Sequence, residues 1–359
     1  MPKRIHTKDI AAKLYATLAS AIENRVFPGA VAGIVSRSGN RTIVPAGHHT
    51  YNTSSTAVTE QSIFDVASIT KSIPTATLAL MAVESGKISL HTRLTEWVPE
   101  YEVTGGNSVT VRHLLTQTVD HGYSLASCKG MTPQDLLHLI FTRDYRLPAG
   151  ERFCYTNTTS ILLGMLVERV LGAPLDVLAR DMLFAPLGME RTTFSPQTLP
   201  QNEILPTEHC DWRGRVVQAE VHDESAFVLR KIMVPGSAGL FSTAPDLLNF
   251  LEMLLNGGRW KNMRVFPAAL LELMYHNQLE RIGRWAGLGW ELNQLRFMGL
   301  HCSAQTIGKT GFTGCVVLCD FEKGRALAFL SNHTFPKRRG SRDAINAVRR
   351  DIADIVFEG

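Results

Sequence analysis

Residues 63–86 read IFDVASITKSIPTATLALMAVESG. In this stretch the hydroxyl of Ser68 precedes the amine of Lys71 by three residues, at the start of an apolar run that predicts a helix. Positions three apart share one face of a helix. A serine hydroxyl is a weak nucleophile at its ordinary pKa, and a lysine that burial keeps neutral can act as its base. The pair is therefore a candidate nucleophile and general base.

A second interpretation of this stretch stays open on these residues alone. About one S-x-x-K is expected by chance in a chain of this length, and Ser68 can instead cap the helix while Lys71 lies on the surface. Pro74 stands in the early turns, where it removes a backbone hydrogen bond unless the regular helix begins after it. Gly86 predicts the end of the helix.

The composition is that of a globular protein. The 359 residues are 45% hydrophobic and 19% charged, which excludes extensive disorder. A net charge of +4 is too dilute to predict a nucleic-acid partner, and the basic cluster at 337–342 is expected to be a solvated loop or a helix start. Because no apolar run reaches membrane-spanning length, we expect no membrane contact. The N-terminal residues lack the pattern of a secretory signal, which predicts a cytoplasmic location, or a periplasmic one if a leader was removed.

The cysteine and histidine spacings indicate neither a metal site nor a disulfide framework. The cysteines have no C-x-x-C or Cys/His ligand spacing: Cys128, Cys154, Cys210, Cys302, Cys315 and Cys319. The tripeptide at 222–224, His-Asp-Glu, has no second pair of ligands at a useful spacing, so it is expected to be a loop near a cleft. We therefore predict no metal and no cofactor.

Hydrophobic periodicity predicts strands near both ends of the chain and helices between them. Strands are expected at 30–36, 42–46, 288–292, 306–309, 316–321 and 326–331. Helices are expected at 7–26, 111–117, 132–141, 158–171, 175–183 and 244–256, and after Ser341. Residues 192–232 are polar and predict loops with one strand pair around 212–217. This pattern predicts an α/β (α+β) protein in which 1–64 and 233–359 form a domain built from both termini and 65–232 form a mainly helical domain.

Two further motifs follow the S-x-x-K in sequence order. Tyr155 and Asn157 form a Y-x-N before a predicted helix, and residues 309–311 form a K-T-G on a predicted strand. A K-T-G is expected in roughly one chain in ten of this size. The combination of S-x-x-K, S-D-N and K-T-G is typical of serine β-lactamases and penicillin-binding proteins. Here Y-x-N stands in the place of S-D-N.

With these motifs the chain resembles the class C branch of the serine β-lactamase and penicillin-binding protein family, which also contains esterases, D,D-peptidases and D-aminopeptidases. The resemblance extends from about residue 28 to 336 and includes LPAGERFCYTNTTSILLGMLVE at 147–168 and GKTGFTGCVVLCDFEKGRALAFLSNHTFP at 308–336. It implies a β-lactamase/transpeptidase-like fold, with an antiparallel sheet flanked by helices, a helical domain, and the active site between them.

The resemblance also implies the catalytic roles. Ser68 would be the acylated nucleophile, and its backbone N–H would form the oxyanion hole together with that of Phe312. Lys71 and Tyr155 would share the general-base work. A tyrosine with a pKa near 10 can do this only where cations favour its phenolate, and Lys71 and Lys309 are the cations available. Taken alone, Tyr155 could instead be a core residue.

The substrate-binding residues are implied in the same way. Asn157 would bind the acyl-side carbonyl of the substrate and Lys71, and it could also cap a helix. Lys309 and Thr310 would line the strand edge where an extended substrate or its carboxylate docks, and Gly311 would let that substrate approach the backbone. Taken alone, Lys309 could instead protect a strand edge. Phe312 stands where many members of the family carry a small residue, and VDHGY at 119–123 departs from the usual segment, so both put the substrate in doubt.

We therefore predict a serine hydrolase that acts through a Ser68 acyl-enzyme on carboxylic esters, small amides or D-amino-acid peptides. The alternatives are a true β-lactamase, a D,D-carboxypeptidase, or a non-catalytic binding or assembly module that keeps the fold. No glutamate that would hold a deacylating water is recognisable, so we expect Tyr155 to direct that water. The expected partner is a small ester, amide or β-lactam, and the sequence is compatible with a monomer and with a homo-oligomer.

Overall fold

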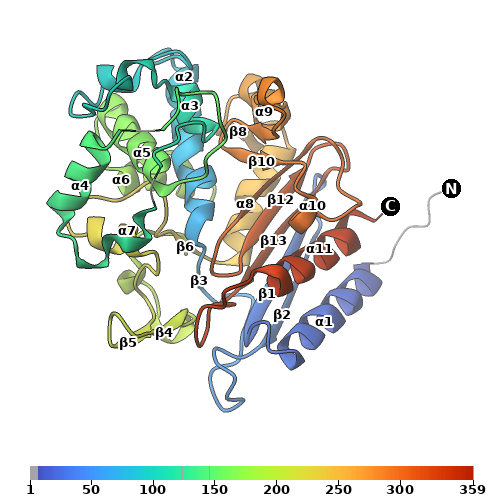
Figure 1. The fold of residues 1–359 in the computed structure, drawn as a ribbon. Coiled ribbons are helices and arrows are strands. Elements are labelled where there is room, and N and C mark those ends of the chain that lie inside the picture. The colour runs from blue at the N-terminus through green and yellow to red at the C-terminus, as the bar shows by residue number, and fades with distance from the viewer. Residues whose placement is uncertain (1–6, 123, 145, 359) are drawn as a thin grey trace.

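The two ends of the chain form one antiparallel sheet. The computed structural model describes residues 7–122, 124–144 and 146–358 (Figure 1). The sheet has seven strands in the order β2-β1-β13-β12-β11-β10-β9. The strands are β1 Gly29–Ser36, β2 Arg41–Gly47, β9 Ala286–Gly287, β10 Trp290–Leu292, β11 Thr306–Thr310, β12 Val316–Asp320 and β13 Arg325–Ser331. Strand β1 pairs with β13 along its length, with Ala30 opposite Ser331, so the N-terminal hairpin joins the C-terminal strands directly.

Helices cover both faces of this sheet. Alternate residues of β1 point to opposite sides, so that Ala32 packs with α1 (Thr7–Glu23) and α11 (Asp343–Phe357), whereas Val31 packs with α8 (Ala244–Leu255). Figure 1 shows α1 and α11 on one side of the sheet and α8 on the other. Because both faces are covered, the central strands are buried along almost their whole length.

The segment that follows Ser68 lies between the sheet and a group of helices (Figure 1). It begins as a 3₁₀ turn at Ala67–Lys71, continues as a π turn at Ser72–Ala76, and becomes the regular helix α2 at Thr77–Glu84. The regular helix therefore begins after Pro74. The missing N–H of this proline thus costs no hydrogen bond of α2, as the sequence required. Nearly every residue of the segment is buried.

The middle of the chain supplies helices and short strand pairs. The helices are α3 Val111–Leu115, α4 Pro133–Thr142, α5 Asn157–Leu171, α6 Leu175–Ala179 with a π turn at Arg180–Phe184, and α7 Glu224–Leu229. The short strands are β3 Phe64–Asp65, which pairs with β6 Phe241–Ser242, β4 Glu208–Cys210 with β5 Arg215–Val217, and β7 Arg259–Trp260 with β8 Met263–Arg264. Helix α9 at Ala268–Tyr275 and the single turn α10 at Leu295–Met298 lie beside the last strands.

The predicted fold class is confirmed, with local differences. Helix α7 lies in the polar stretch that was expected to be loop, and α9 was not predicted. The strand expected at 288–292 begins only at Trp290, because Gly289, with a φ of 80°, lies in the turn between β9 and β10. The division into a domain of both termini and a helical domain stays a prediction. No helix in the described ranges is long and apolar enough to cross a membrane.

Two glycines let α5 lie directly against the chain segment 235–239. A Cβ atom on Gly236 would lie 2.4 Å from the carbonyl oxygen of Ser160, and one on Gly164 would lie 3.1 Å from the Cα of Gly236. Both contacts are with backbone atoms, which cannot move aside as a side-chain tip can. The two segments therefore approach more closely than any larger residue allows.

We predict that Gly236→Ala lowers the free energy of unfolding by about 1–3 kcal/mol, because overpacking forces the backbone apart. Gly130→Ala is the matched control, since a Cβ there would meet nothing within 4 Å. Urea denaturation measures both variants. Equal midpoints for Gly236→Ala and Gly130→Ala would contradict the close contact.

Candidate active site

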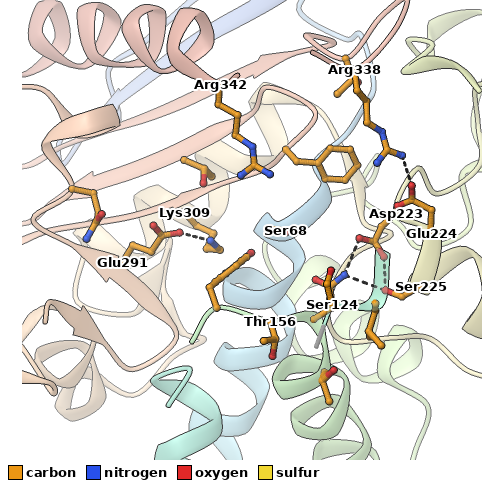
Figure 2. A pocket seen from close by; sticks show the side chains of 18 of the residues that line it. Ser68, Ser124, Thr156, Asp223, Glu224, Ser225, Glu291, Lys309, Arg338 and Arg342 are labelled. Carbon is orange, nitrogen blue, oxygen red and sulfur yellow. Dashed lines mark hydrogen bonds and ion pairs between the residues drawn. The ribbon is translucent and has the colours of Figure 1, made fainter. Parts of the chain in front are cut away.

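Ser68 opens into a cavity that is lined by residues of all three motifs. This cavity has a volume of about 520 Å³ and lies between the 3₁₀ turn, the start of α5, strand β11 and the segment after β13 (Figure 2). Of the predicted site residues, the cavity is lined by Ser68, Tyr155, Asn157, Lys309, Thr310 and Phe312. The structure therefore brings the three sequence motifs to one place.

Lys71 is buried next to the nucleophile. Its Nζ lies 3.1 Å from Ser68 Oγ, 2.8 Å from Asn157 Oδ1 and 2.6 Å from the carbonyl oxygen of Ser237. The side chain has no carboxylate in ion-pair contact among the described residues. Burial therefore lowers the pKa of the Lys71 amine below its ordinary value, because the charged form loses its hydration.

The hydrogen bonds of Lys71 suit a neutral amine. A neutral amine has two N–H donors and one lone pair. Asn157 Oδ1 and the Ser237 carbonyl can only accept, so they take both N–H groups. The third contact of Nζ is with Ser68 Oγ: an ammonium donates to it, whereas a neutral amine has its lone pair left for the hydroxyl proton.

Tyr155 lies between two lysines at the mouth of the cavity. Lys309 Nζ is 4.5 Å and Lys71 Nζ is 5.3 Å from the centre of its ring. Desolvation acts to raise the pKa of the phenol, but the two lysines outweigh it and the pKa falls below its ordinary value. The side chain is 43% exposed, so water can reach it. When Lys71 is neutral, Lys309 is the lysine that favours the Tyr155 phenolate, since it is the larger of the two influences and its own pKa is raised.

Lys309 remains a cation because of a residue that the sequence did not single out. Glu291, on the neighbouring strand β10, forms an ion pair with Lys309 Nζ and also accepts a hydrogen bond from Arg296 at 3.2 Å. Although burial disfavours the charge of Lys309, Glu291 and Tyr155 raise its pKa above the ordinary value. The sequence placed Glu291 in a predicted strand. It could not show that this strand pairs with the strand of Lys309, because that depends on the order of the strands in the sheet.

The glycine of K-T-G lets two segments of the protein's own backbone approach each other. A Cβ on Gly311 would lie 2.4 Å from the carbonyl oxygen of Val66, so this glycine allows β11 to approach the chain just before Ser68. Gly311 is buried and does not line the cavity. The close approach involves the protein's own backbone, and the role of Gly311 toward a substrate stays a prediction.

A buried arginine holds the turn that carries Phe312. The guanidinium of Arg349, on α11, donates to the carbonyl oxygens of Gly311 at 2.6 Å, Cys315 at 2.9 Å and Gly314 at 3.1 Å. Burial lowers the pKa of Arg349 to about 10, so the group stays charged at neutral pH. These bonds fix the turn from which the Phe312 N–H would reach an oxyanion.

A buried carboxylate holds the turn that carries Ser68. Asp65 accepts hydrogen bonds from the N–H groups of Ala67 and His222, each at 2.8 Å, and its carbonyl oxygen accepts from Thr313 Oγ1 at 2.8 Å. Ala67 has a φ of 49°, which is uncommon for a residue with a side chain and places Ser68 at a sharp turn. Asp65 therefore connects the nucleophile to both neighbouring loops.

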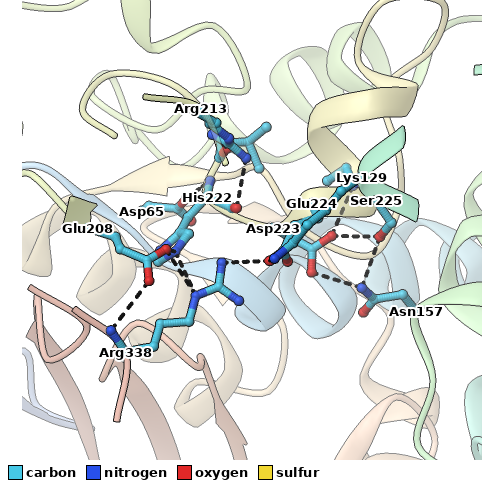
Figure 3. A network of polar contacts seen from close by, with 12 residues as sticks. Asp65, Lys129, Asn157, Glu208, Arg213, His222, Asp223, Glu224, Ser225 and Arg338 are labelled. Carbon is cyan, nitrogen blue, oxygen red and sulfur yellow. Dashed lines mark hydrogen bonds and ion pairs between the residues drawn. The ribbon is translucent and has the colours of Figure 1, made fainter. Parts of the chain in front are cut away.

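The amide of Asn157 points differently from the expectation. Its Oδ1 accepts from Lys71, as predicted, but its Nδ2 donates to Asp223 Oδ2 at 2.9 Å and to Ser225 Oγ at 3.1 Å (Figure 3). The reverse orientation would place N–H against the amine and oxygen against the carboxylate. Both N–H groups are thus occupied by protein acceptors, and the predicted bond from Asn157 to a substrate carbonyl stays a prediction. The helix cap is Thr156.

The basic cluster at 337–342 forms part of the cavity wall. Arg338 binds Glu208 at 3.2 Å and Glu224 at 2.9 Å (Figure 3). Its guanidinium lies 5.2 Å from the centre of the Phe312 ring. Residues 337–342 form an exposed loop, as expected, and the ion pairs of Arg338 hold this loop beside the cavity. Arg342 also lines the cavity.

Two predicted loops also border the site. Asp223 and Glu224 line the cavity, so the tripeptide at 222–224 lies near a cleft as predicted. No group of three His, Cys, Asp or Glu suited to a metal occurs among the described residues. Within 119–130, Ser124 and Leu125 line the cavity, and Tyr123 lies outside the described residues.

Comparison with known proteins agrees with the fold. A family model, Beta-lactamase, matches residues 15–350. A putative D-alanyl-D-alanine carboxypeptidase of Escherichia coli (strain K12) is 28% identical over 305 residues, which cover 76% of this chain and 70% of that protein. The structure of EstCE1, a hydrolase with promiscuous acyltransferase activity, has a TM-score of 0.76 at 20% identity and covers 98% of this chain and 100% of its own.

A further solved structure is the octameric penicillin-binding protein homologue from Pyrococcus abyssi. It has a TM-score of 0.71 at 24% identity and covers 94% of this chain and 76% of its own. At these identities the likeness to solved structures shows the fold alone. The predicted β-lactamase/transpeptidase-like fold is confirmed.

If Lys71 is the base predicted for Ser68, kcat/KM for an ester substrate falls as the pH is lowered through the pKa of Lys71, because only a neutral amine can accept a proton. Burial lowers this pKa from 10.5, so the midpoint of the limb lies below that value. Lys71→Met should remove the limb and lower kcat/KM by about 10²–10⁴.

Lys337→Met is the control for this experiment, because Lys337 is an exposed lysine paired with Asp211 at 3.0 Å. Its pH profile should match that of the wild type. A limb that survives in Lys71→Met would assign the proton acceptor to another group.

Proposed function

The chain belongs to the beta-lactamase family, and on this premise we propose that it is a serine hydrolase that acts through an acyl-enzyme on Ser68. The observation that carries the proposal is the buried Lys71 amine, 3.1 Å from Ser68 Oγ, with both of its N–H groups held by acceptors. The proposed substrates are carboxylic esters, small amides or D-amino-acid peptides.

Acylation follows from the positions of three groups. Neutral Lys71 takes the proton of Ser68, with Tyr155 beside it, and Oγ forms a bond to the substrate carbonyl carbon. The negative charge that develops on the carbonyl oxygen faces the N–H groups of Ser68 and Phe312, and one such donor is typically worth about 10²–10³ in rate. The bond to the leaving group then breaks, and the proton held by Lys71 passes to it. An acyl ester on Ser68 remains.

Deacylation needs a water molecule and a base on the open side of the cavity. Tyr155 is half exposed, and its lowered pKa favours a phenolate that can accept a proton from water. The hydroxide oxygen bonds to the acyl carbon, the bond to Ser68 Oγ breaks, and the proton returns to Oγ. This role of Tyr155 stays a proposal.

The charges around the cavity favour substrates that carry an anionic group. Lys309 and Arg296 share Glu291, and Arg338 is paired with Glu208 and Glu224. The Arg342 side chain lines the same cavity and makes no hydrogen bond or ion pair with another described residue. Figure 2 shows it on the side of Lys309. A substrate carboxylate would supply its counter-ion.

This unpaired cation supports a second candidate function, that of a D,D-carboxypeptidase. Such an enzyme releases an amino acid that bears a free carboxylate, which would meet Arg342 and Thr310. The name of the Escherichia coli relative points the same way. A true β-lactamase would use the same cation for the carboxylate of its substrate. A cytoplasmic location stays a prediction.

We expect a fluorescent fluorophosphonate to label the wild-type protein and to leave Ser68→Ala unlabelled. Turnover of p-nitrophenyl butyrate, nitrocefin and D-alanyl-D-alanine peptides, each measured with Ser68→Ala as the blank, then ranks the substrate classes. Equal labelling of both proteins would overturn the proposal. A folded wild type with neither labelling nor turnover would support a binding module instead.

We predict that Arg342→Gln raises KM for carboxyphenyl butyrate about 10-fold relative to phenyl butyrate, because a charge-assisted hydrogen bond to the carboxylate is lost. Arg350→Gln, an exposed position on α11, is the matched control and should leave the ratio unchanged. The two esters differ in one charge, so an unchanged ratio in Arg342→Gln would remove Arg342 from substrate binding.

A further inference from the structure

The cavity contains one carboxylate without a counter-ion. Three acidic side chains line it: Asp223, Glu224 and Glu291. Glu224 is paired with Arg338 at 2.9 Å and with Lys129 at 3.7 Å, and Glu291 is paired with Lys309 and Arg296. Asp223 forms no ion pair within the part of the chain that the structure describes. Its charge is therefore balanced by no protein cation in direct contact.

The hydrogen bonds of Asp223 leave one acceptor position open. Oδ1 accepts from Ser225 Oγ at 2.6 Å and from the Ala226 N–H at 2.9 Å, and Oδ2 accepts from Asn157 Nδ2 at 2.9 Å (Figure 3). All three donors are neutral. A carboxylate has about four acceptor sites, so Oδ2 keeps one for a further donor.

Lys71 does not serve as the missing counter-ion. The amide of Asn157 separates its Nζ from Asp223, since Oδ1 meets the lysine and Nδ2 meets the carboxylate. The form of Lys71 that takes the proton of Ser68 is neutral. In the state that is ready to react, no cation of the described residues forms an ion pair with Asp223, so this position is open to a cationic group of the substrate.

Asp223 faces the acyl part of a bound substrate. It lies two hydrogen bonds from Lys71, on the Asn157 side of the nucleophile, whereas Arg342 and Lys309 lie on the other side (Figure 2). The leaving group belongs to the side of Arg342 if that residue binds its carboxylate. The group beside Asp223 is then part of the acyl moiety.

The side of the cavity formed by Asn157 and Asp223 offers a substrate a hydrogen-bond acceptor, whereas a free amide N–H would offer a donor. Both Asn157 N–H groups are occupied, so the wall presents an acceptor with a negative charge. A substrate carbonyl placed there would be repelled, whereas a donor with a positive charge would be attracted. A free ammonium group has both properties.

We propose that Asp223 binds an ammonium group on the acyl part of the substrate, so that the preferred substrates are aminoacyl esters or amides with a free amino group. With a carboxylate on the leaving group, such a substrate is a small zwitterion that spans the cavity from Asp223 to Arg342. This inference rests on the proposed acyl-enzyme function, and it assigns Asp223 to specificity.

The test compares alanine p-nitroanilide with propionyl p-nitroanilide, which lacks only the ammonium group. Both enantiomers of the alanine substrate are measured. We expect the wild type to favour the better alanine enantiomer by about 10- to 100-fold in kcat/KM, as for a hydrogen bond to a charged group. Asp223→Asn should reduce this ratio to near one. Any loss common to both substrates reports the contact with Asn157 and cancels in the ratio.

Glu224→Gln is the matched control, because it removes the same charge from the same cavity at a carboxylate that is already paired. It should keep the preference for the alanine substrate. A melting temperature for each variant shows that it is folded. A wild type that cleaves both anilides equally, or an Asp223→Asn variant that keeps the full preference, would overturn the inference.

Protection from labelling tests the same site without turnover. Alaninamide should slow the reaction of the wild type with the fluorophosphonate at a concentration about 10- to 100-fold lower than propionamide does, and Asp223→Asn should remove this difference. Equal protection by the two amides would contradict the ammonium site. Absence of labelling would instead contradict the proposed acyl-enzyme, so the two failures are distinguishable.

Discussion

The burial of one amine among oxygen acceptors is the constraint on which the site depends. Lys71 receives no carboxylate partner, and two of its contacts come from the start of α5 and from the segment around Ser237. Those two segments must therefore touch, and they do so through the glycine pair Gly164 and Gly236. The packing that excludes water from the amine is the same packing that lowers its pKa. A substitution that moves these glycines apart would therefore change the surroundings, and hence the pKa, of Lys71 more directly than those of Ser68.

Two buried ionic groups fix the backbone on either side of the nucleophile. Asp65 accepts hydrogen bonds from backbone N–H groups beside the turn that carries Ser68. Arg349 donates hydrogen bonds to the carbonyl oxygens of the turn that carries Phe312. Backbone groups satisfy the hydrogen bonds of the Asp65 carboxyl and of the Arg349 guanidinium, so neither group needs an ion pair that could compete for the substrate. The two N–H donors proposed for the oxyanion are thereby held in place before the reaction begins, which is what electrostatic stabilisation of a transition state requires.

The sequence predicts those features that depend on short spacings. The strands of the sheet, the S-x-x-K turn and the order of the motifs follow from local patterns, and the structure places Ser68, Tyr155 and Lys309 around one cavity. The roles proposed for Asp223 and Arg342 could not be predicted from the sequence. They depend on the fact that the other charged residues around the cavity form ion pairs, whereas Asp223 and Arg342 form none among the described residues. Those pairs join segments far apart in the chain. The roles of the motif residues remain predictions, since geometry shows only that they meet.

The 3₁₀ geometry at the nucleophile explains a proline that a regular helix would not tolerate. Pro74 has no N–H to give to the carbonyl four residues before it, so the turns that precede it cannot complete an α-helical ladder. The chain there adopts a 3₁₀ turn at Ala67–Lys71 and a π turn at Ser72–Ala76. In a 3₁₀ turn, side chains three residues apart lie directly above one another, which they do not in an α-helix. The missing hydrogen bond of Pro74 thus favours the geometry in which the amine of Lys71 lies over the hydroxyl of Ser68.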